Sequence, residues 1–205
     1  MADAAISLDF SSASEEVLAG HWKTVGLEVP EALVQETLKR GSRMVPYLGP
    51  MIADPRAWAE WEGSAGWAPV HALKLLSLIG GPQAGFYVTA FIMHAQGEDW
   101  MTEDGPTLIA SVGPEFLEDG GRLIADPEIS PSGRWVTVDG LCLMGLSHEE
   151  HRDAVIARLT EVTRELLDRE PFTTDDAVAM TALGVALATL HDEGSRELIE
   201  RAYAQ

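Results

Sequence analysis

The sequence predicts an all-α fold: a single-domain, right-handed α-solenoid of about four to five antiparallel helix pairs. Apolar side chains in residues 69–79 recur three and four positions apart, which is the spacing of one buried helix face. Gly80-Gly81-Pro82 then ends that helix and opens a second one that is apolar almost all round. Such a helix must be covered on several sides, so the pair needs further helices as neighbours.

Weak internal repeats supply those neighbours. Trp67 recurs 33 residues later as Trp100, and Trp135 follows after a further 35 residues. The segment 52–55 (Ile-Ala-Asp-Pro) reappears as 124–127, a shift of 72 residues, or two units of 36. A period of about 33 to 37 residues with two helices per unit is typical of an α-solenoid. We interpret the three tryptophans as contacts between successive units; the alternative is an aromatic ridge for a partner.

The first half of the chain is predicted to hold a capping helix, within residues 1–27, and then the first repeats. The expected helices span residues 13–25, 30–39, 41–53, 68–79 and 82–95, with a connection at 55–67 that includes a helical turn at 56–62. Ser12 opens a capping box for the first of them. Gly49-Pro50 should kink or shorten the third. His71, Lys74 and Ser77 fall on the solvent side of the fourth.

The second half continues the pattern. The expected helices span residues 102–112, 114–125, 136–146, 147–169, 174–190 and 193–204, with a loop at 97–100 and a mobile loop at 126–134. Ser147 and Thr174 are the expected caps of two of these helices. Gly120-Gly121 lies inside a helix, where each glycine costs roughly 1 kcal/mol relative to alanine. We interpret the pair as a close approach of a neighbouring helix; the alternative is a bare backbone for a ligand.

Residues 70–84 read Val-His-Ala-Leu-Lys-Leu-Leu-Ser-Leu-Ile-Gly-Gly-Pro-Gln-Ala, and this segment resembles the HEAT-like repeat of the phycobilisome-lyase type. Residues 41–55 resemble the second helix of another such unit. The resemblance extends over residues 28–205 and is sharp in these two units only. It implies a curved superhelix that offers a surface to protein partners, and it implies no single chemistry.

The composition is acidic: 33 Asp and Glu residues against 14 Lys and Arg give a net charge of −19. This charge repels nucleic-acid phosphates and anionic membranes, so we expect neither as a partner. It favours a basic protein or peptide partner; the alternative is that it serves solubility alone. No apolar run reaches 18 residues, no signal peptide is recognisable, and the single Cys142 allows no internal disulfide. We therefore expect a cytoplasmic protein.

His148 and His151 are the candidates for metal ligands. They lie three residues apart on a predicted helix, whereas the helical H-E-x-x-H zinc motif places its histidines four apart, and a third ligand would have to come from elsewhere. We interpret residues 148–151 as a solvated first helical turn and expect no metal and no cofactor. Cys142 lies in an apolar stretch and is interpreted as a core residue, so no catalytic residue is assigned.

The candidate binding surface lies on two second helices of the predicted units. Acidic side chains and one arginine share a face of the helix 114–125, and aromatic residues come from the preceding helix and the following connection. The predicted partner-binding set comprises Tyr87, His94, Trp100, Glu115, Glu118, Asp119 and Arg122. The alternative interpretation of these residues is an ordinary solvated face.

Three functions follow from these patterns. The first is a non-enzymatic scaffold or binding module that presents an acidic concave surface to a protein or peptide partner. The second is a small enzyme or a chromophore-handling protein with a pocket on the concave face, which histidines and carboxylates in a closed cavity would favour. The third, based on charge alone, is an acidic mimic of nucleic acid, which would require carboxylates spaced like duplex phosphates.

Overall fold

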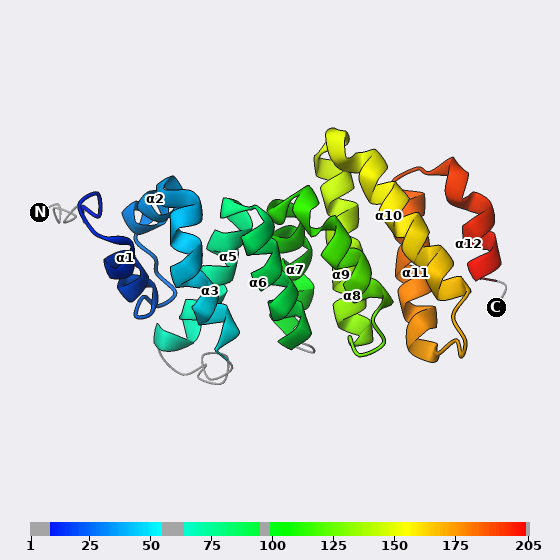
Figure 1. Cartoon of the computed structure of the whole chain (residues 1–205), viewed down its shortest axis with the longest axis horizontal. Helices are drawn as coiled ribbons and strands as arrows, with labels where there is room; N and C mark the ends of the chain where they lie inside the picture. The colour runs from blue at the N-terminus through cyan, green and yellow to red at the C-terminus, as the bar shows by residue number, and fades with distance from the viewer. Residues whose placement is uncertain (1–8, 55–63, 95–98, 204–205) are drawn as a thin grey trace, which may run out of the picture. The chain divides into compact units, whose positions relative to one another are not determined.

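The computed structural model describes residues 9–54, 64–94 and 99–203, and all regular structure in these ranges is helical (Figure 1). The predicted all-α class is therefore confirmed. The chain separates into two compact units, residues 1–87 (unit 1) and residues 88–205 (unit 2). Within the described ranges, no helix combines the length and the hydropathy that a membrane span requires.

Unit 1 follows the predicted order of helices. Its elements are α1 (Glu15–Trp22), α2 (Glu31–Arg40), a 3-10 turn (Gly41–Met44), α3 (Val45–Ala53), a 3-10 turn (Ser64–Trp67), α5 (Ala68–Ile79) and the first turns of α6 (Pro82–His94). Helix α5 is central, because α1, α2 and α3 all pack against it. The predicted turn at 56–62 lies outside the described residues. Gly41, Gly80 and Gly81 have φ values of 57°, 70° and 85°, which explains why glycine ends α2 and α5.

The expected cap of α1 is wrong, and the expected shortening of α3 is not observed. Ser14 caps α1 instead of Ser12, because the Ser14 backbone is extended there and its Oγ accepts a hydrogen bond from the Val17 amide at 3.3 Å. Gly49-Pro50 does not end α3, which continues to Ala53. Pro50 lies on an exposed side of the helix, so the carbonyl that loses its donor one turn earlier can be hydrated.

The expected solvent side of α5 is largely covered. Ser77 is 1% exposed, and His71 is half-buried with its Nε2 atom 2.9 Å from the Gly26 carbonyl oxygen. The His71 ring contacts the rings of Trp22 and Trp67, with centroid distances of 5.5 and 6.1 Å. The segment that follows α1 therefore covers a face that the periodicity assigned to water, and Lys74 alone of the three predicted residues is exposed there.

Unit 2 contains the rest of α6 and six further helices in its described residues. These are α7 (Asp99–Val112), α8 (Leu117–Ala125) after a 3-10 turn (Pro114–Phe116), α9 (Pro131–Ser147), α10 (Glu149–Leu167), α11 (Thr174–Thr189) and α12 (Arg196–Ala202) after a 3-10 turn (Glu193–Ser195). Because α7 begins at Asp99, both Asp99 and Trp100 are helical, and the expected loop at 97–100 is wrong at these two positions.

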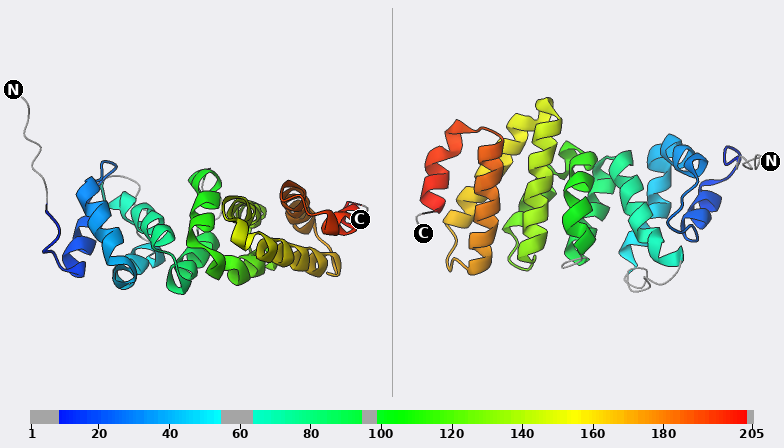
Figure 2. Two further views of the ribbon diagram at one scale, coloured as in Figure 1. Left: turned by 90° about the horizontal axis from the view of Figure 1, so that it is seen from above. Right: turned by 180° about the vertical axis from the view of Figure 1, so that it is seen from behind.

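The helices of unit 2 form two layers. Helix α9 packs against α7 on one side and α11 on the other, and these three helices lie side by side in Figure 2. Helix α10 packs against α8 and α12 in the second layer, and it also contacts α9 and α11. The core of unit 2 includes Leu141, Leu159 and Leu183, which are fully buried.

The expected mobile loop at 126–134 is a short turn followed by the first turn of α9. Asp126 Oδ1 accepts a hydrogen bond from the Glu128 amide at 2.9 Å, and Ile129 is 2% exposed, which anchors the turn. Ser130 Oγ accepts from the Gly133 amide at 3.2 Å and so caps a helix that begins with Pro131. Turn-rich composition here marks a helix start.

Two other expected caps are displaced. The capping box of α11 uses Thr173 and Asp176 instead of Thr174, because Thr173 is the last residue with extended backbone. Ser147 does not cap α10, since it is the last residue of α9 and His148 takes the capping position without a side-chain bond. A polar residue near a helix start can cap it only from the single position with extended dihedrals.

Close packing explains the two glycines inside α8. A Cβ on Gly121 would lie 2.0 Å from Nε of Arg158 on α10, and a Cβ on Gly120 would lie 3.3 Å from Cδ1 of Leu141 on α9. The predicted close approach of neighbouring helices is confirmed at both positions.

A buried polar cluster joins four segments of unit 2. Arg134 on α9 is fully buried, and its guanidinium donates to the Ile124 carbonyl at 2.6 Å and to Asp176 Oδ1 at 2.9 Å. Arg169 donates to the same oxygen at 2.9 Å, and Thr173 Oγ1 donates to Asp176 Oδ2 at 2.8 Å. Burial alone would raise the pKa of Asp176, but the bonds from Thr173 and Arg134 together outweigh it and hold the pKa below the ordinary value of 3.8.

Candidate functional site

The predicted partner-binding residues divide between the two units. Tyr87 belongs to unit 1, and Glu115, Glu118, Asp119 and Arg122 belong to unit 2. The side chains of His94 and Trp100 lie outside the part of the chain that the structure describes. The predicted set is therefore best judged separately in each unit.

In unit 2, the predicted face is an exposed network of ion pairs. Arg122 lies 3.0 Å from Asp119 Oδ1 and 3.5 Å from Glu118 Oε1, and Arg158 of α10 also lies 3.5 Å from Glu118. Exposed pairs of this kind contribute about 0–1 kcal/mol each. Charge on this face is partly neutralised locally, which is the behaviour of a solvated helix surface.

The two candidate metal ligands, His148 and His151, lie near each other at the start of α10. The ring centroids of His148 and His151 are 5.7 Å apart, and His148 Nδ1 lies 3.8 Å from Glu150 Oε1. Among the described residues, no group of three His, Cys, Asp or Glu side chains is arranged to hold a metal ion. A stable zinc or iron site needs at least that many protein ligands in one place.

The surroundings of Cys142, the single thiol of the chain, favour its protonated form. Cys142 is 8% exposed, and burial together with the nearby Asp139 carboxylate raises the pKa of the thiol. Burial also raises the pKa of Asp139, against the effect of a hydrogen bond of 2.9 Å from Trp135 Nε1. A thiol of raised pKa is a poor nucleophile, so this corner of α9 is suited to packing and not to covalent chemistry.

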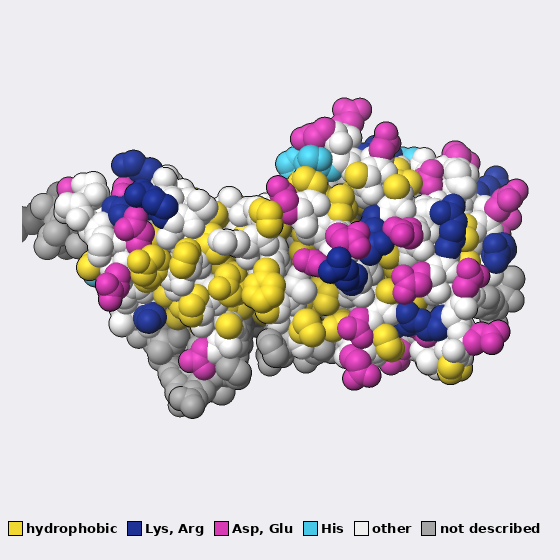
Figure 3. Space-filling view, viewed as in Figure 1, with side chains coloured by type: hydrophobic (Ala, Val, Ile, Leu, Met, Phe, Trp, Pro, Cys, Tyr) yellow, Lys and Arg dark blue, Asp and Glu magenta, His cyan; other side chains and the backbone are white. Residues whose placement is uncertain are grey.

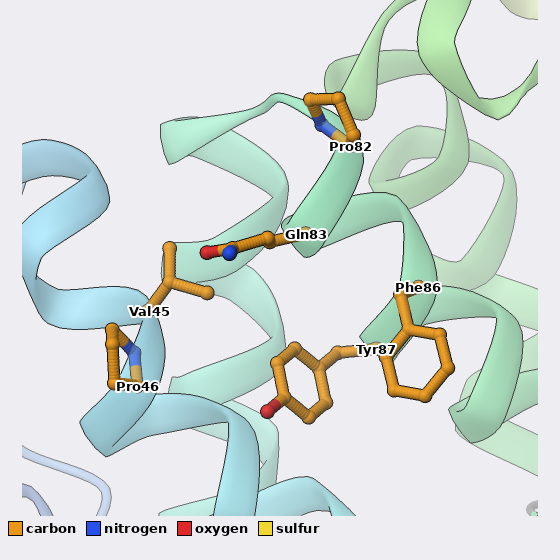
Figure 4. A pocket seen from close by; sticks show the side chains of 6 residues that line it. All are labelled: Val45, Pro46, Pro82, Gln83, Phe86 and Tyr87. Atoms are coloured by element: carbon orange, nitrogen blue, oxygen red, sulfur yellow. The ribbon is translucent and has the colours of Figure 1, made fainter.

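A hollow of about 440 Å³ opens in unit 1, where the starts of α3 and α6 face each other (Figure 4). Gln83 and Tyr87 extend from α6 toward α3, and the Phe86 ring lies next to Tyr87. The two rings meet edge to face with centroids 5.4 Å apart and an interplanar angle of 75°. The hollow is lined by Val45, Pro46, Pro82, Gln83, Phe86 and Tyr87.

A glycine determines the depth of this hollow. Gly49 is buried on α3, and a Cβ at this position would lie 2.0 Å from Cζ of Tyr87. Any larger residue would therefore displace the Tyr87 ring. Glycine at position 49 lets the outer end of the Tyr87 ring approach the α3 backbone closely, and Tyr87 lines the hollow.

The two helices that line the hollow carry no formal charge. Neither α3 nor α6 contains Asp, Glu, Lys or Arg, although 23% of the chain belongs to these types. The side of unit 1 seen in Figure 3 shows apolar side chains gathered over α3, α5 and α6, whereas acidic and basic side chains are scattered over the visible side of unit 2. Phe86 and Leu78 are 64% and 62% exposed. A contiguous apolar patch on an otherwise charged protein marks an interaction site.

Two polar side chains at the hollow are available for hydrogen bonds. Within the described part of the chain, neither the Gln83 amide nor the Tyr87 hydroxyl has a hydrogen-bond partner. Both side chains can donate and accept. The hollow therefore combines an apolar lining with a small number of polar groups, which is the usual composition of a binding pocket.

The sequence contained a signal for this site that residue types alone did not identify. The helix 82–95 was predicted to be covered on several sides because it is apolar almost all round. The structure leaves Phe86 exposed on it instead. The missing signal is the coincidence of two uncharged helices, residues 45–53 and 82–94, at neighbouring positions in the fold.

Comparisons with known proteins found no relative of this chain. No protein-family model, no curated protein sequence and no solved structure matches this chain.

Proposed function

We propose that the chain is a HEAT-like α-solenoid of about four to five helix pairs that acts as a non-enzymatic, cytoplasmic binding module. Its partner, a protein or peptide, docks on the uncharged surface of α3 and α6 in unit 1. The observation that carries the proposal is the hollow of about 440 Å³ beside Phe86, which is 64% exposed on a helix without a charged side chain. Aromatic residues in such positions are the commonest anchors of protein interfaces.

The packing inside unit 2 supports the solenoid part of the proposal. Helices α9 and α11 contact each other within one layer and also contact α10 in the opposite layer, and α9 contacts α8 there as well. Repeats that contact only adjacent repeats stack in this way. The α5–α6 pair, with its two-glycine turn, supports the same arrangement for unit 1.

The proposed binding surface, on α3 and α6, is apolar, whereas the surface predicted from the sequence is acidic. The predicted acidic residues of α8 are engaged in exposed ion pairs, and Arg122 alone contacts two of them. The net charge of −19 keeps its role as a long-range field that favours a basic partner.

Site-specific photo-crosslinking tests the proposal. A photoreactive phenylalanine analogue replaces Phe86 in one sample and Leu146 in another; Leu146 is 51% exposed on α9 and serves as the matched control. We expect a discrete protein adduct from position 86 only. The captured protein, once purified, should bind the wild-type chain and bind the Phe86→Asp variant at least about tenfold more weakly.

Adducts of equal yield from both positions would contradict the proposal. So would a captured protein whose affinity is the same for the wild type and for Phe86→Asp, provided that circular dichroism shows both to be folded.

A further inference from the structure

We infer that the occupant of the hollow is an extended, proline-rich segment of a partner protein with basic residues on its flanks. This inference rests on the proposed function and specifies its partner. Three features of the described residues carry it: the aromatic and uncharged lining, the two unpartnered polar side chains, and the charge of the chain.

The lining selects apolar, rigid side chains. Phe86 and Tyr87 meet edge to face and present ring surfaces, and Pro46 and Pro82 complete walls that contain no charge. Aromatic-lined grooves bind proline-rich segments, because a polyproline II helix is already ordered and loses little entropy on binding. A charged side chain in the same hollow would lose its hydration without gaining a partner.

The polar groups distinguish an extended segment from a helix. Gln83 and Tyr87 reach from α6 toward α3 and can donate hydrogen bonds to a bound chain (Figure 4). An α-helix satisfies its own carbonyl oxygens, except at its end, so a helical partner would leave both donors unused. An extended polyproline II segment has solvated carbonyls with no internal partner and can accept both bonds.

The charge of the chain selects basic flanks. A second copy of this chain would bring a net charge of −19 toward another of −19, so self-association on this surface is opposed by repulsion. Unit 1 by itself is also acidic, with 10 acidic and six basic side chains in residues 1–87. Three of its cations are paired: Lys39 and Arg40 with Glu36, and Arg43 with Glu15, at distances of 2.9–3.4 Å. Lysine or arginine on either side of the apolar segment would be attracted.

Fluorescence anisotropy with defined peptides tests the inference. The probe is a labelled peptide of the sequence Lys-Lys-Pro-Pro-Leu-Pro-Pro-Leu-Pro-Lys-Lys, titrated with the intact chain. We expect saturable binding that weakens as salt is raised. Phe86→Ala should weaken it by about tenfold or more, and Tyr87→Phe, which keeps the ring, by about three- to tenfold. Leu146→Ala, an exposed site on α9 outside the lining and the apolar patch, should leave it unchanged.

Three further measurements decide among other occupants. A peptide with Glu in place of Lys should bind more weakly, and a lysine-flanked amphipathic helix should not compete. Competition by the helical peptide, equal binding by the Tyr87→Phe variant, or concentration-dependent dimers that Phe86→Asp dissolves would each overturn the inference. If the proline-rich peptide does not bind while binding of a captured protein still depends on Phe86, the proposed binding function is supported and the inference of an extended occupant is wrong. If the peptide does not bind and no captured protein depends on Phe86, the proposed function is contradicted as well.

Discussion

Unit 1 and unit 2 use charge in opposite ways. Residues 1–87 contain 10 acidic and six basic side chains, whereas residues 88–205 contain 23 acidic and eight basic ones. All eight basic residues of unit 2 are arginines, and all three lysines of the chain lie in unit 1. Unit 2 contains a fully buried arginine, Arg134, whereas α3 and the first turns of α6 in unit 1 have no charged side chain.

Three arginines of unit 2, one of them buried and two partly buried, bind the ends of helices. Arg134 and Arg169 donate to the last carbonyls of α8, and Arg152 donates to the Leu190 carbonyl at the end of α11. These carbonyls have no partner within their own helices and lie at the negative end of the helix dipole. The comparison shows that cations in a strongly acidic unit can stabilise its packing by binding the carbonyl groups at helix ends. Unit 1 achieves its packing with aromatic rings and a glycine contact instead.

The largest expected effect on stability comes from the buried polar cluster of unit 2. Asp176→Ala removes the carboxylate that Arg134 and Arg169 share and leaves Arg134 buried without a counter-charge. We expect the free energy of unfolding to fall by about 3–5 kcal/mol, measured by urea denaturation. Asp175→Ala, at an exposed neighbouring position, should change it by no more than about 0.5 kcal/mol. Equal effects of the two variants would show that the buried cluster does not stabilise unit 2.

The corresponding contact of unit 1 should be weaker. Gly49→Ala forces the Tyr87 ring from its place and should destabilise the chain by about 1–3 kcal/mol. The same change in a Tyr87→Ala background should cost much less, because the clash is then absent. Gly20→Ala is the matched control: a Cβ there has no neighbour within 4 Å, and alanine should stabilise α1 by about 0.5–1 kcal/mol. Additive effects of Gly49→Ala and Tyr87→Ala would contradict the proposed contact.

A buried hydroxyl in unit 1 offers a smaller test. Ser77 is 1% exposed, and its Oγ has no hydrogen-bond partner in the described part of the chain. Ser77→Ala should therefore raise the free energy of unfolding by about 1 kcal/mol. Ser111→Ala removes an exposed hydroxyl that donates to the Thr107 carbonyl at 2.8 Å and should bring no gain. Destabilisation by Ser77→Ala would mean that the hydroxyl has a partner, such as a buried water.

The two units should respond to different ranges of pH. Burial lowers the pKa of His71 below its ordinary value of 6.5, helped by Lys74 and opposed by the bond to Gly26. Between the folded and unfolded pKa values the unfolded chain binds more protons, so stability falls as the pH drops below about 6.5. Asp176, with a lowered pKa, loses its contribution only as the pH falls below the ordinary value of 3.8.

Denaturation curves between about pH 7.5 and pH 5 measure the first of these effects. His71→Gln should flatten the slope in this range, while Asp176→Ala should leave the slope in place. An unchanged slope in His71→Gln would assign the acid sensitivity to another histidine.

The sequence predicted helix boundaries best where proline begins a helix and glycine ends it. The helix at 68–79 has the boundaries of α5, because proline opens it and two glycines with positive φ end it. Positions of caps were less predictable, as Ser14 and Thr173 show, because capping depends on which residue has extended dihedrals. The sequence 126–134 was interpreted as a loop because it has two prolines, yet Pro131 starts α9.

Tertiary partners explain what the sequence did not reveal. Arg134 is buried because Asp176, 42 residues away, and the end of α8 accept its hydrogen bonds. No local pattern indicates such a pairing. The hollow beside Phe86 was missed for the same reason: periodicity identifies an apolar face and does not tell whether another helix covers it. Tyr87 was among the predicted residues, but it was assigned to an acidic surface, and the hollow that it lines is uncharged.

The distribution of lysines has a practical consequence for work with this chain. Lys23, Lys39 and Lys74 are exposed, all belong to unit 1, and unit 2 offers no side-chain amine. Reagents that acylate amines will therefore label one unit and spare the other. Attachment of the chain to an amine-coupling surface will hold it by the unit that carries the hollow, so binding assays on such surfaces should use a tag in unit 2 instead.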